Sequence, residues 1–215
     1  MLLHTQRAGL LATALAMNRE GINHGSSGNV SLRNGDGFMI TPSALAYDKC
    51  RAGDMVQVSM EGEVLVGVRK PSSEWILHRD IYVGRAEAGA VLHAHSPWCT
   101  TLACLEREIP PSHYMVAMAG GNSIACASYA LFGSRELSVN ALAALDSGRS
   151  ACLLAHHGMV CFAPGLDEVL TLAIEVENLA RVYVQALQVE EPRWLSDLEM
   201  EAVQERFVDY KNTGS

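Results

Sequence analysis

The amino-acid sequence predicts a mixed α/β fold, a single domain in which a central, mainly antiparallel β-sheet is flanked by helices. Three observations predict it. Short strand-like segments gather in the middle of the chain, amphipathic helical segments flank them, and 215 residues are about the length of one domain. We therefore expect residues 1–215 to form one domain.

The first half of the chain predicts one amphipathic helix and then a series of short strands. Residues 6–20 place Leu, Ala and Met side chains on one side of a helix. A loop rich in Gly, Asn and Ser follows at 21–28, and tight turns at 34–37 and 61–62 each join two strands. The strands are expected at 29–32, 38–41, 55–59 and 64–68.

The second half of the chain combines buried strands with longer helices. Pro71-Ser72-Ser73-Glu74 predicts a helix start, because a Ser cap and an acid in the first turn suit the exposed backbone N–H groups there. Ser196-Asp197-Leu198-Glu199 matches a capping box and predicts another. Strands are expected at 90–95 and 151–155, and helices from 72 to about 85 and over about 97–105, 167–188 and 196–210.

The composition describes a globular protein with an acidic surface. Hydrophobic residues make up 49% and charged residues 19%, which is enough to build a core and excludes a disordered chain. The formal net charge is −8, so the sequence predicts neither nucleic-acid binding nor binding to an anionic membrane, both of which need a basic field. Any phosphate that the protein binds must be held by local dipoles.

The chain is expected to work in the cytoplasm. It has neither an apolar run of the roughly 18–20 residues that span a bilayer nor a signal peptide at its start. The six cysteines include no CxxC pair and mostly lie in apolar runs, so they are expected to be free, buried thiols.

Three histidines predict a metal site. His93-Ala94-His95 lies on a predicted strand, where side chains two residues apart point to the same face. A third imidazole, that of His156 or His157, follows the apolar strand 151–155. Three imidazoles around one ion leave a position for a substrate, as in a catalytic zinc site.

An acidic residue is the second part of this site. Glu74 lies at a predicted helix start directly after two serines, where it is either a simple N-terminal charge or a general base beside the metal. His78 follows one helical turn later, and we expect it to be a structural or surface residue of the helix.

Small residues in three places are suited to binding an anion. Each of these segments offers hydroxyls and backbone N–H groups, and the last also has the positive end of a helix dipole. Together with a metal they suggest a phosphorylated small molecule, and the absence of GxxxxGK[ST] and GxGxxG gives no indication of a nucleotide. The segments are Gly25-Ser26-Ser27-Gly28-Asn29, Thr41-Pro42-Ser43-Ala44 and Ser72-Ser73.

These motifs, in this order, resemble the class II aldolase family, which includes fuculose-phosphate aldolases, ribulose-phosphate 4-epimerases and the adducin head, and the resemblance is strongest to the fuculose-phosphate aldolase branch. It covers nearly the whole chain. The motifs are Gly25-Ser26-Ser27-Gly28-Asn29-Val30-Ser31, Ile40-Thr41-Pro42, Pro71-Ser72-Ser73-Glu74-Trp75, His93-Ala94-His95, His113-Tyr114, Ala119-Gly120-Gly121-Asn122-Ser123-Ile124, Tyr129 to Leu137 and His156-His157-Gly158.

The resemblance implies a role for each matching residue. His93, His95 and His156 would hold Zn²⁺, with Glu74 on or near the metal and His157 beside the ligands or in a structural role. Mn²⁺, Co²⁺ or Fe²⁺ would suit the same ligands. Tyr114 would donate a proton across a subunit interface of a homotetramer. The other implied substrate contacts are Gly28, Asn29, Ser43, Ala44, Ser72 and Ser73 around the phosphate, and Phe132 and Tyr210 near the aldehyde. Ala44 stands where the family usually has Gly.

The activity that the resemblance implies is an aldolase reaction. A ketose 1-phosphate, either L-fuculose 1-phosphate or a 5-deoxy- or 5-methylthio-ribulose 1-phosphate, would be cleaved reversibly into dihydroxyacetone phosphate and a short aldehyde, through an enediolate that the metal stabilises, with Glu74 as the proton-transfer group. Epimerases, dehydratases and decarboxylases of the family share the histidines and are the alternatives. A non-catalytic, adducin-like scaffold is a further one, which the retained histidines and Glu74 disfavour.

Overall fold

The chain folds around one mixed sheet, which has eight strands in the described residues, in the order β4-β3-β2-β1-β5-β8-β7-β6. The computed structural model describes residues 2–146 and 148–213, and of residues 2 and 208–213 it describes the backbone alone. All neighbouring strands run antiparallel except β6 and β7. The strands are β1 (Asn29–Asn34), β2 (Gly37–Ile40), β3 (Val56–Ser59), β4 (Val64–Val66), β5 (Ala90–Ala94), β6 (Cys126–Ala127), β7 (Ala151–Leu154) and β8 (Gly158–Ala163).

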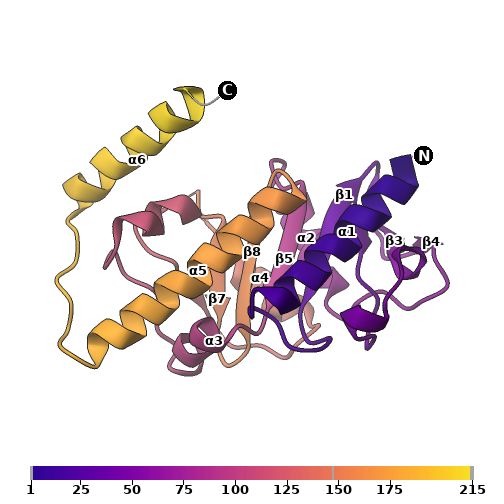
Figure 1. The fold of residues 1–215 in the computed structure, drawn as a ribbon, viewed down its shortest axis with the longest axis horizontal. Coiled ribbons are helices and arrows are strands. Elements are labelled where there is room, and N and C mark those ends of the chain that lie inside the picture. The colour runs from indigo at the N-terminus through magenta and orange to yellow at the C-terminus, as the bar shows by residue number, and fades with distance from the viewer. Residues whose placement is uncertain (1, 147, 214–215) are drawn as a thin grey trace.

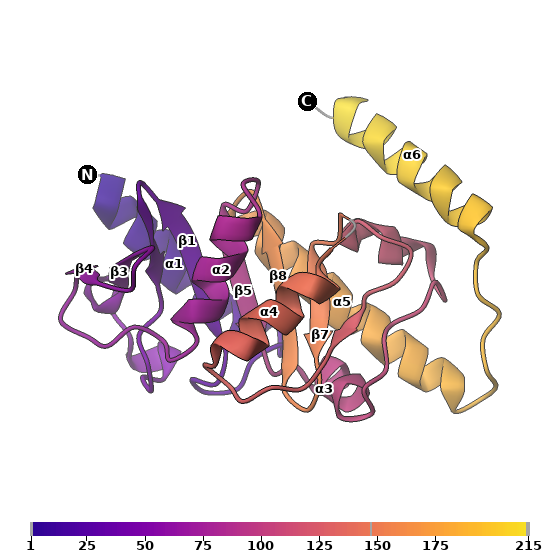
Figure 2. The ribbon, with the colours of Figure 1, turned by 180° about the vertical axis from the view of Figure 1, so that it is seen from behind.

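Helices cover both faces of the sheet. Helices α1 (Leu2–Arg19) and α5 (Leu166–Leu187) cover one face, and α2 (Trp75–Gly84) and α4 (Arg135–Ala144) cover the other (Figures 1 and 2). Each face has its own apolar core, because strands that are buried on both sides must pack against a helix layer on each. The predicted fold class, a helix-flanked and mainly antiparallel sheet, is therefore confirmed.

The remaining helices lie at the margins of the sheet. Helix α3 (Pro97–Cys104) follows β5 directly, and α6 (Asp197–Thr213) projects beyond the main body beside the short 3-10 helix η3 (Tyr114–Ala119) (Figure 1). Two further short 3-10 helices, η1 (Tyr47–Lys49) and η2 (Ala52–Asp54), precede β3. The capping box predicted before α6 is present: the Glu199 N–H donates to Ser196 Oγ, and the Ser196 N–H donates to Glu199 Oε2. No described helix is both long and apolar enough to cross a bilayer.

Strands β6 and β8 were not predicted, and the reason that β8 was missed lies in the turn before it. Strands β7 and β8 form a hairpin whose loop is Ala155-His156-His157, and His156 adopts the left-handed conformation with φ of 54°. Such a loop usually has Gly or Asn at that position. Because His occupies that position, the sequence gives no turn signal after the strand predicted at 151–155. Strand β8, which is separated from β7 by residues 155–157, was therefore not predicted. Helix α4 was also missed.

The cysteines are free thiols, as expected. Three of them, Cys99, Cys152 and Cys161, are buried, whereas Cys104 is exposed. Burial raises the pKa of the fully buried thiols, so they are inert at neutral pH.

The start of α3 sets the position of the chain that follows β5. The Glu177 carboxylate on α5 accepts hydrogen bonds from the backbone N–H groups of Trp98 and Cys99, each at 2.9 Å. A negative charge at a helix N-terminus is stabilising. We expect Glu177→Gln to lower the free energy of unfolding by about 1–2 kcal/mol in urea denaturation. Glu175→Gln is the matched control, because the Glu175 side chain forms no hydrogen bond or ion pair within the described chain. An equal loss in that variant would contradict the capping role.

Candidate metal centre

Four side chains from three parts of the fold converge on one point. Glu74 is the N-cap residue of α2, His93 lies on β5, His95 directly follows β5, and His157 lies in the β7–β8 turn. One ligand atom from each of the four lies within 4.8 Å of the others. The three imidazole rings are 4.7–4.9 Å apart, centroid to centroid. Three imidazoles and one carboxylate form the donor set of a zinc-type site.

The strand packing places these side chains. The His93 and His95 rings lie close together, as the two-residue spacing predicted, with their centroids 4.9 Å apart. Strand β8 lies directly beside β5. Gly158 makes this contact possible, because a Cβ at that position would lie 2.3 Å from the Ala94 carbonyl oxygen. The turn before Gly158 therefore lies against the end of β5, and its His157 ring reaches the other two.

The polar atoms of this cluster are those that a cation would satisfy. Glu74 Oε1, His93 Nε2 and His95 Nε2 are buried and form no hydrogen bond within the described residues, although His93 Nε2 lies 3.1 Å from Glu74 Oε2. Buried polar atoms are rarely left in this state, because each loses its hydration without compensation. His93 Nδ1 donates to the carbonyl oxygen of Met159 at 2.8 Å, which leaves the lone pair on Nε2 free for a metal ion. The residues therefore fit a divalent metal.

The charges within the cluster suit the same ligand set. Burial alone would raise the pKa of Glu74, but the neighbouring His93, His157 and Asn29 outweigh it and hold that pKa well below its ordinary value. Burial, with the neighbouring His93, lowers the pKa of both His95 and His157 to about 4. Burial alone would lower the pKa of His93, but the Glu74 carboxylate outweighs it and raises that pKa. Near pH 7 the site thus offers an ionised carboxylate and the neutral imidazoles of His95 and His157, the protonation states that bind metal.

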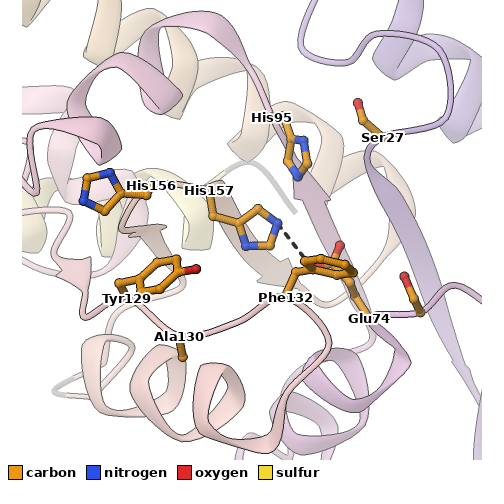
Figure 3. Close-up of a pocket in the computed structure, with 9 residues that line it drawn as sticks. Ser27, Glu74, His95, Tyr129, Ala130, Phe132, His156 and His157 are labelled. Atoms are coloured by element: carbon orange, nitrogen blue, oxygen red, sulfur yellow. Dashed lines mark ion pairs between the residues drawn. The ribbon is translucent and has the colours of Figure 1, made fainter.

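The third imidazole of the cluster is that of His157, which corrects the predicted ligand His156. The positive φ of His156 turns its side chain away, and its Nε2 pairs with Glu106 Oε1 at 3.0 Å in an exposed position. His157 Nε2 instead lies 3.3 Å from Glu74 Oε1, and Figure 3 shows its ring directed at that carboxylate while the His156 ring points away. Composition and spacing could not distinguish the two, because the choice depends on the backbone conformation of the turn.

Beside the cluster lies a cavity of about 360 Å³. Tyr129, Ala130 and Phe132 line it, so the structure brings the predicted Phe132 to the site. The sequence alone suggested no role for Tyr129 or Ala130, although Tyr129 begins one of the motifs that resemble the family. The residues that line the cavity are Ser27, Ser73, Glu74, His95, Tyr129, Ala130, Phe132, His156 and His157 (Figure 3).

Two of the predicted anion-binding segments lie side by side. The Ser43 N–H donates to the Lys70 carbonyl oxygen at 3.0 Å, and the Ser72 N–H donates to the Thr41 carbonyl oxygen at 3.1 Å. Those two N–H groups are therefore already bound within the protein. The hydroxyls of Ser43 and Ser73 form no hydrogen bond in the described residues, so they are the donors left for a ligand.

The other predicted phosphate contacts have specific local geometries. Gly28 donates its N–H to Asn23 Oδ1 at 2.8 Å, and a Cβ on Gly28 would lie 2.7 Å from the His93 carbonyl oxygen. Asn29 donates its side-chain N–H to Glu74 Oε2 at 3.0 Å. Ala44 adopts φ of 54°, a left-handed conformation that favours Gly, the residue that the resemblance leads us to expect at this position.

The two predicted tyrosines do not line the cavity of this chain. Tyr114 begins η3 with 51% of its surface exposed, and it remains a predicted donor to a neighbouring subunit. Tyr210 lies in α6, and its side chain is outside the described part of the chain, so its predicted contact remains a prediction.

His78 is a buried residue of α2 behind the cluster, in agreement with the expected structural role. It is fully buried, and burial lowers its pKa to about 3. The unfolded chain takes up a proton near pH 6.5, whereas the folded chain does not until about pH 3, so stability is lost as the pH falls between these values. In chelator-treated protein, we expect His78 to contribute a loss of up to about 1.4 kcal/mol per pH unit below 6.5.

Urea unfolding at pH 7 and pH 5 measures this contribution. The wild-type protein should lose more stability between the two pH values than His78→Gln, because Gln does not titrate in this range. An equal loss in the two proteins would show that His78 is not held neutral in the folded state.

Comparison with known proteins places this chain in one family. A sequence profile of the Class II Aldolase and Adducin N-terminal domain matches residues 8–184. A 5-methylthioribulose-1-phosphate/5-deoxyribulose-1-phosphate aldolase of Rhodospirillum rubrum is 52% identical over 95% of this chain and 91% of its own length. An L-fuculose phosphate aldolase of Escherichia coli is 45% identical over 94% of this chain and 93% of its own length.

A solved structure gives the same result. An L-fuculose 1-phosphate aldolase superimposes with a TM-score of 0.91 at 36% identity, over 94% of this chain and 96% of that one. This structure and the two sequence relatives are all named as aldolases, which are lyases. Together with the imidazole and carboxylate cluster, this shows that the chain belongs to the class II aldolase and adducin N-terminal domain family and is an enzyme of the metal-dependent aldolase type.

Proposed function

We propose that this chain reversibly cleaves a ketose 1-phosphate into dihydroxyacetone phosphate and a short aldehyde, with Zn²⁺ as the metal. The observation that carries the proposal is the Glu74 carboxylate, which faces three imidazoles at the wall of a cavity. Mn²⁺, Co²⁺ and Fe²⁺ suit the same donors. Relatives named for L-fuculose phosphate and for 5-methylthio- and 5-deoxyribulose 1-phosphate support these three sugars as substrates.

A divalent ion bound by Glu74, His93, His95 and His157 would act as a Lewis acid, which stabilises negative charge on substrate oxygens while the carbon–carbon bond breaks. Glu74 performs the proton transfer. In the condensation direction its carboxylate takes a proton from the carbon of dihydroxyacetone phosphate that forms the new bond. In the cleavage direction the step is reversed: the protonated Glu74 side chain gives a proton to the same carbon.

The two ends of the substrate meet different surfaces. The phosphate is held by the dipoles of hydroxyl and backbone groups, because the net charge of the protein is acidic. These groups are the hydroxyls of Ser43 and Ser73 and the region of Gly28, Asn29, Ala44 and Ser72. Tyr129, Ala130 and Phe132 present an apolar wall, which suits an aldehyde that ends in a methyl or methylthio group. L-Lactaldehyde, acetaldehyde and a methylthio-aldehyde all end in this way. Tyr210 is proposed to approach the same end.

We also propose a homotetramer with active sites at the subunit interfaces. Tyr114 is exposed and lies outside the cavity of its own chain, so the proton that the aldehyde oxygen receives in condensation would come from Tyr114 of the partner subunit. The proposed location is the cytoplasm, where reducing conditions preserve the six free thiols. Light scattering of the purified protein measures the assembly, and a monomer would contradict it.

Product analysis tests the proposed reaction. The zinc-loaded enzyme is incubated with dihydroxyacetone phosphate and each of the three aldehydes, and the products are identified by mass spectrometry and NMR. We expect a ketose 1-phosphate from at least one aldehyde. Condensation with none of them, by protein that has taken up the metal, would contradict the aldolase assignment.

A further inference from the structure

A buried series of hydrogen bonds runs from the metal cluster into the protein behind it. Asn29 Nδ2 donates to Glu74 Oε2 at 3.0 Å, and Asn29 Oδ1 lies 2.5 Å from His78 Nε2. His78 Nδ1 lies 2.6 Å from Ser31 Oγ, which lies 2.7 Å from the Tyr82 hydroxyl. All five residues are buried, with relative exposures of 0–5%. The series connects β1 with α2, the helix that Glu74 begins.

Simple donor and acceptor rules give this series one direction. The Glu74 carboxylate only accepts, so Asn29 must turn its NH₂ group toward it and its carbonyl oxygen toward His78. That oxygen only accepts, so His78 must carry its proton on Nε2. His78 is fully buried and neutral, so its bare Nδ1 accepts the Ser31 hydroxyl proton. The Ser31 oxygen can then accept from Tyr82.

We propose that His78 is a positioning residue that acts on Glu74 through Asn29. Its Nε2–H holds the Asn29 amide in the one orientation that donates to the carboxylate. Without that donor the amide is free to flip, and its oxygen would then face a carboxylate oxygen, two acceptors that repel each other. The inference rests on the proposed function, because Glu74 is there both a metal ligand and the proton-transfer group.

Loss of the hydrogen bond from His78 to Asn29 should change metal binding as well as turnover. Substituting an outer partner of a metal ligand typically costs 10–100-fold in metal affinity or activity. We expect His78→Asn, which is too short to reach Asn29, to weaken Zn²⁺ binding about 10-fold or more in a chelator competition. It should lower kcat by a similar factor and leave KM within about twofold, because the substrate contacts remain.

Two further variants separate positioning from a loss of packing. The Gln amide nitrogen reaches about as far as the Nε2 of His, so His78→Gln should restore most of the zinc affinity and kcat. Tyr82→Phe is the matched control, since it removes one buried hydroxyl from the far end of the series and leaves the contact of His78 with Asn29. Its zinc affinity and kcat should stay within about twofold of the wild type. Equal effects of His78→Asn and Tyr82→Phe would overturn the proposal.

A double variant tests whether the effect passes through Asn29. If it does, Asn29→Ala combined with His78→Asn should bind zinc no more weakly than Asn29→Ala alone. Losses that multiply in the double variant would show that His78 acts independently of Asn29, and would overturn the proposal.

The wild-type protein provides a test that does not depend on whether a variant folds. Nitrogen NMR of ¹⁵N-histidine-labelled holoenzyme should show His78 neutral at pH 7, with its proton on Nε2. The other tautomer would refute the assigned direction. These outcomes are distinct from failure of the proposed function: a wild type that binds no divalent metal contradicts the function, whereas normal binding by His78→Asn contradicts this inference alone.

Discussion

Replacing Glu74 by Gln is expected to lower kcat for carbon–carbon cleavage by about 10²–10⁴-fold, the usual contribution of a general acid or base. Gln keeps the shape of the side chain and can still accept through its amide oxygen, but it cannot take up and return a proton. The measurement is the rate of dihydroxyacetone phosphate release from a ketose 1-phosphate, with metal content determined on the same sample so that the loss of a ligand is separated from the loss of a base.

Glu106→Gln is the matched control for this variant. Glu106 is an exposed acid that pairs with His156 and takes no part in the cluster. Its kcat should stay within about twofold of the wild type, with folding of both variants verified by circular dichroism. If metal-loaded Glu74→Gln cleaves the substrate as fast as the wild type, the proton-transfer role is wrong.

The neighbouring histidines His156 and His157 should respond to substitution in opposite ways. His157→Ala removes one of three imidazoles from the cluster, so we expect zinc affinity to fall by about 100-fold or more, since loss of an outer partner alone costs 10–100-fold. Activity at limiting zinc should fall with it. His156→Ala removes an exposed ring that lies outside the cluster, so its metal content should equal that of the wild type.

Metal analysis of the two variants after dialysis against a weak chelator makes the comparison direct. The two substitutions delete the same side chain from adjacent positions of one turn, so each controls for the other. If His157→Ala kept the wild-type metal content and His156→Ala lost metal, the metal ligand would be His156 and not His157.

The fold class could be predicted because its signals are local. The capping box at Ser196 and the two-residue spacing of His93 and His95 depend only on neighbouring residues, and both are found in the structure. Strand β8 could not be predicted because His156 occupies the left-handed position of the turn before it, where Gly or Asn is usual and would indicate a turn. The same backbone feature decides which histidine joins the cluster. The conformation of one turn therefore explains both the missed strand and the presence of His157 in the cluster instead of His156.

The sequence predicted the position of Glu74 near a helix start but not the direction of its carboxylate. The pattern placed an acid in the first turn of a helix, whereas the structure has Glu74 at the N-cap position, with its carboxylate turned to the imidazoles. Asn29, which donates to the carboxylate, is 45 residues away, and the packing of β1 against α2 brings the two side chains together. Long-range contacts of this kind leave no periodic signal in a single sequence.

Anomalous diffraction from a zinc-loaded crystal locates the ion without reference to activity. We expect one strong peak at about 2.0–2.2 Å from a ring nitrogen of each of His93, His95 and His157, beside the Glu74 carboxylate. A peak bound by His156 and Glu106, or no peak among the three imidazoles in crystals grown at saturating zinc, would contradict this ligand assignment.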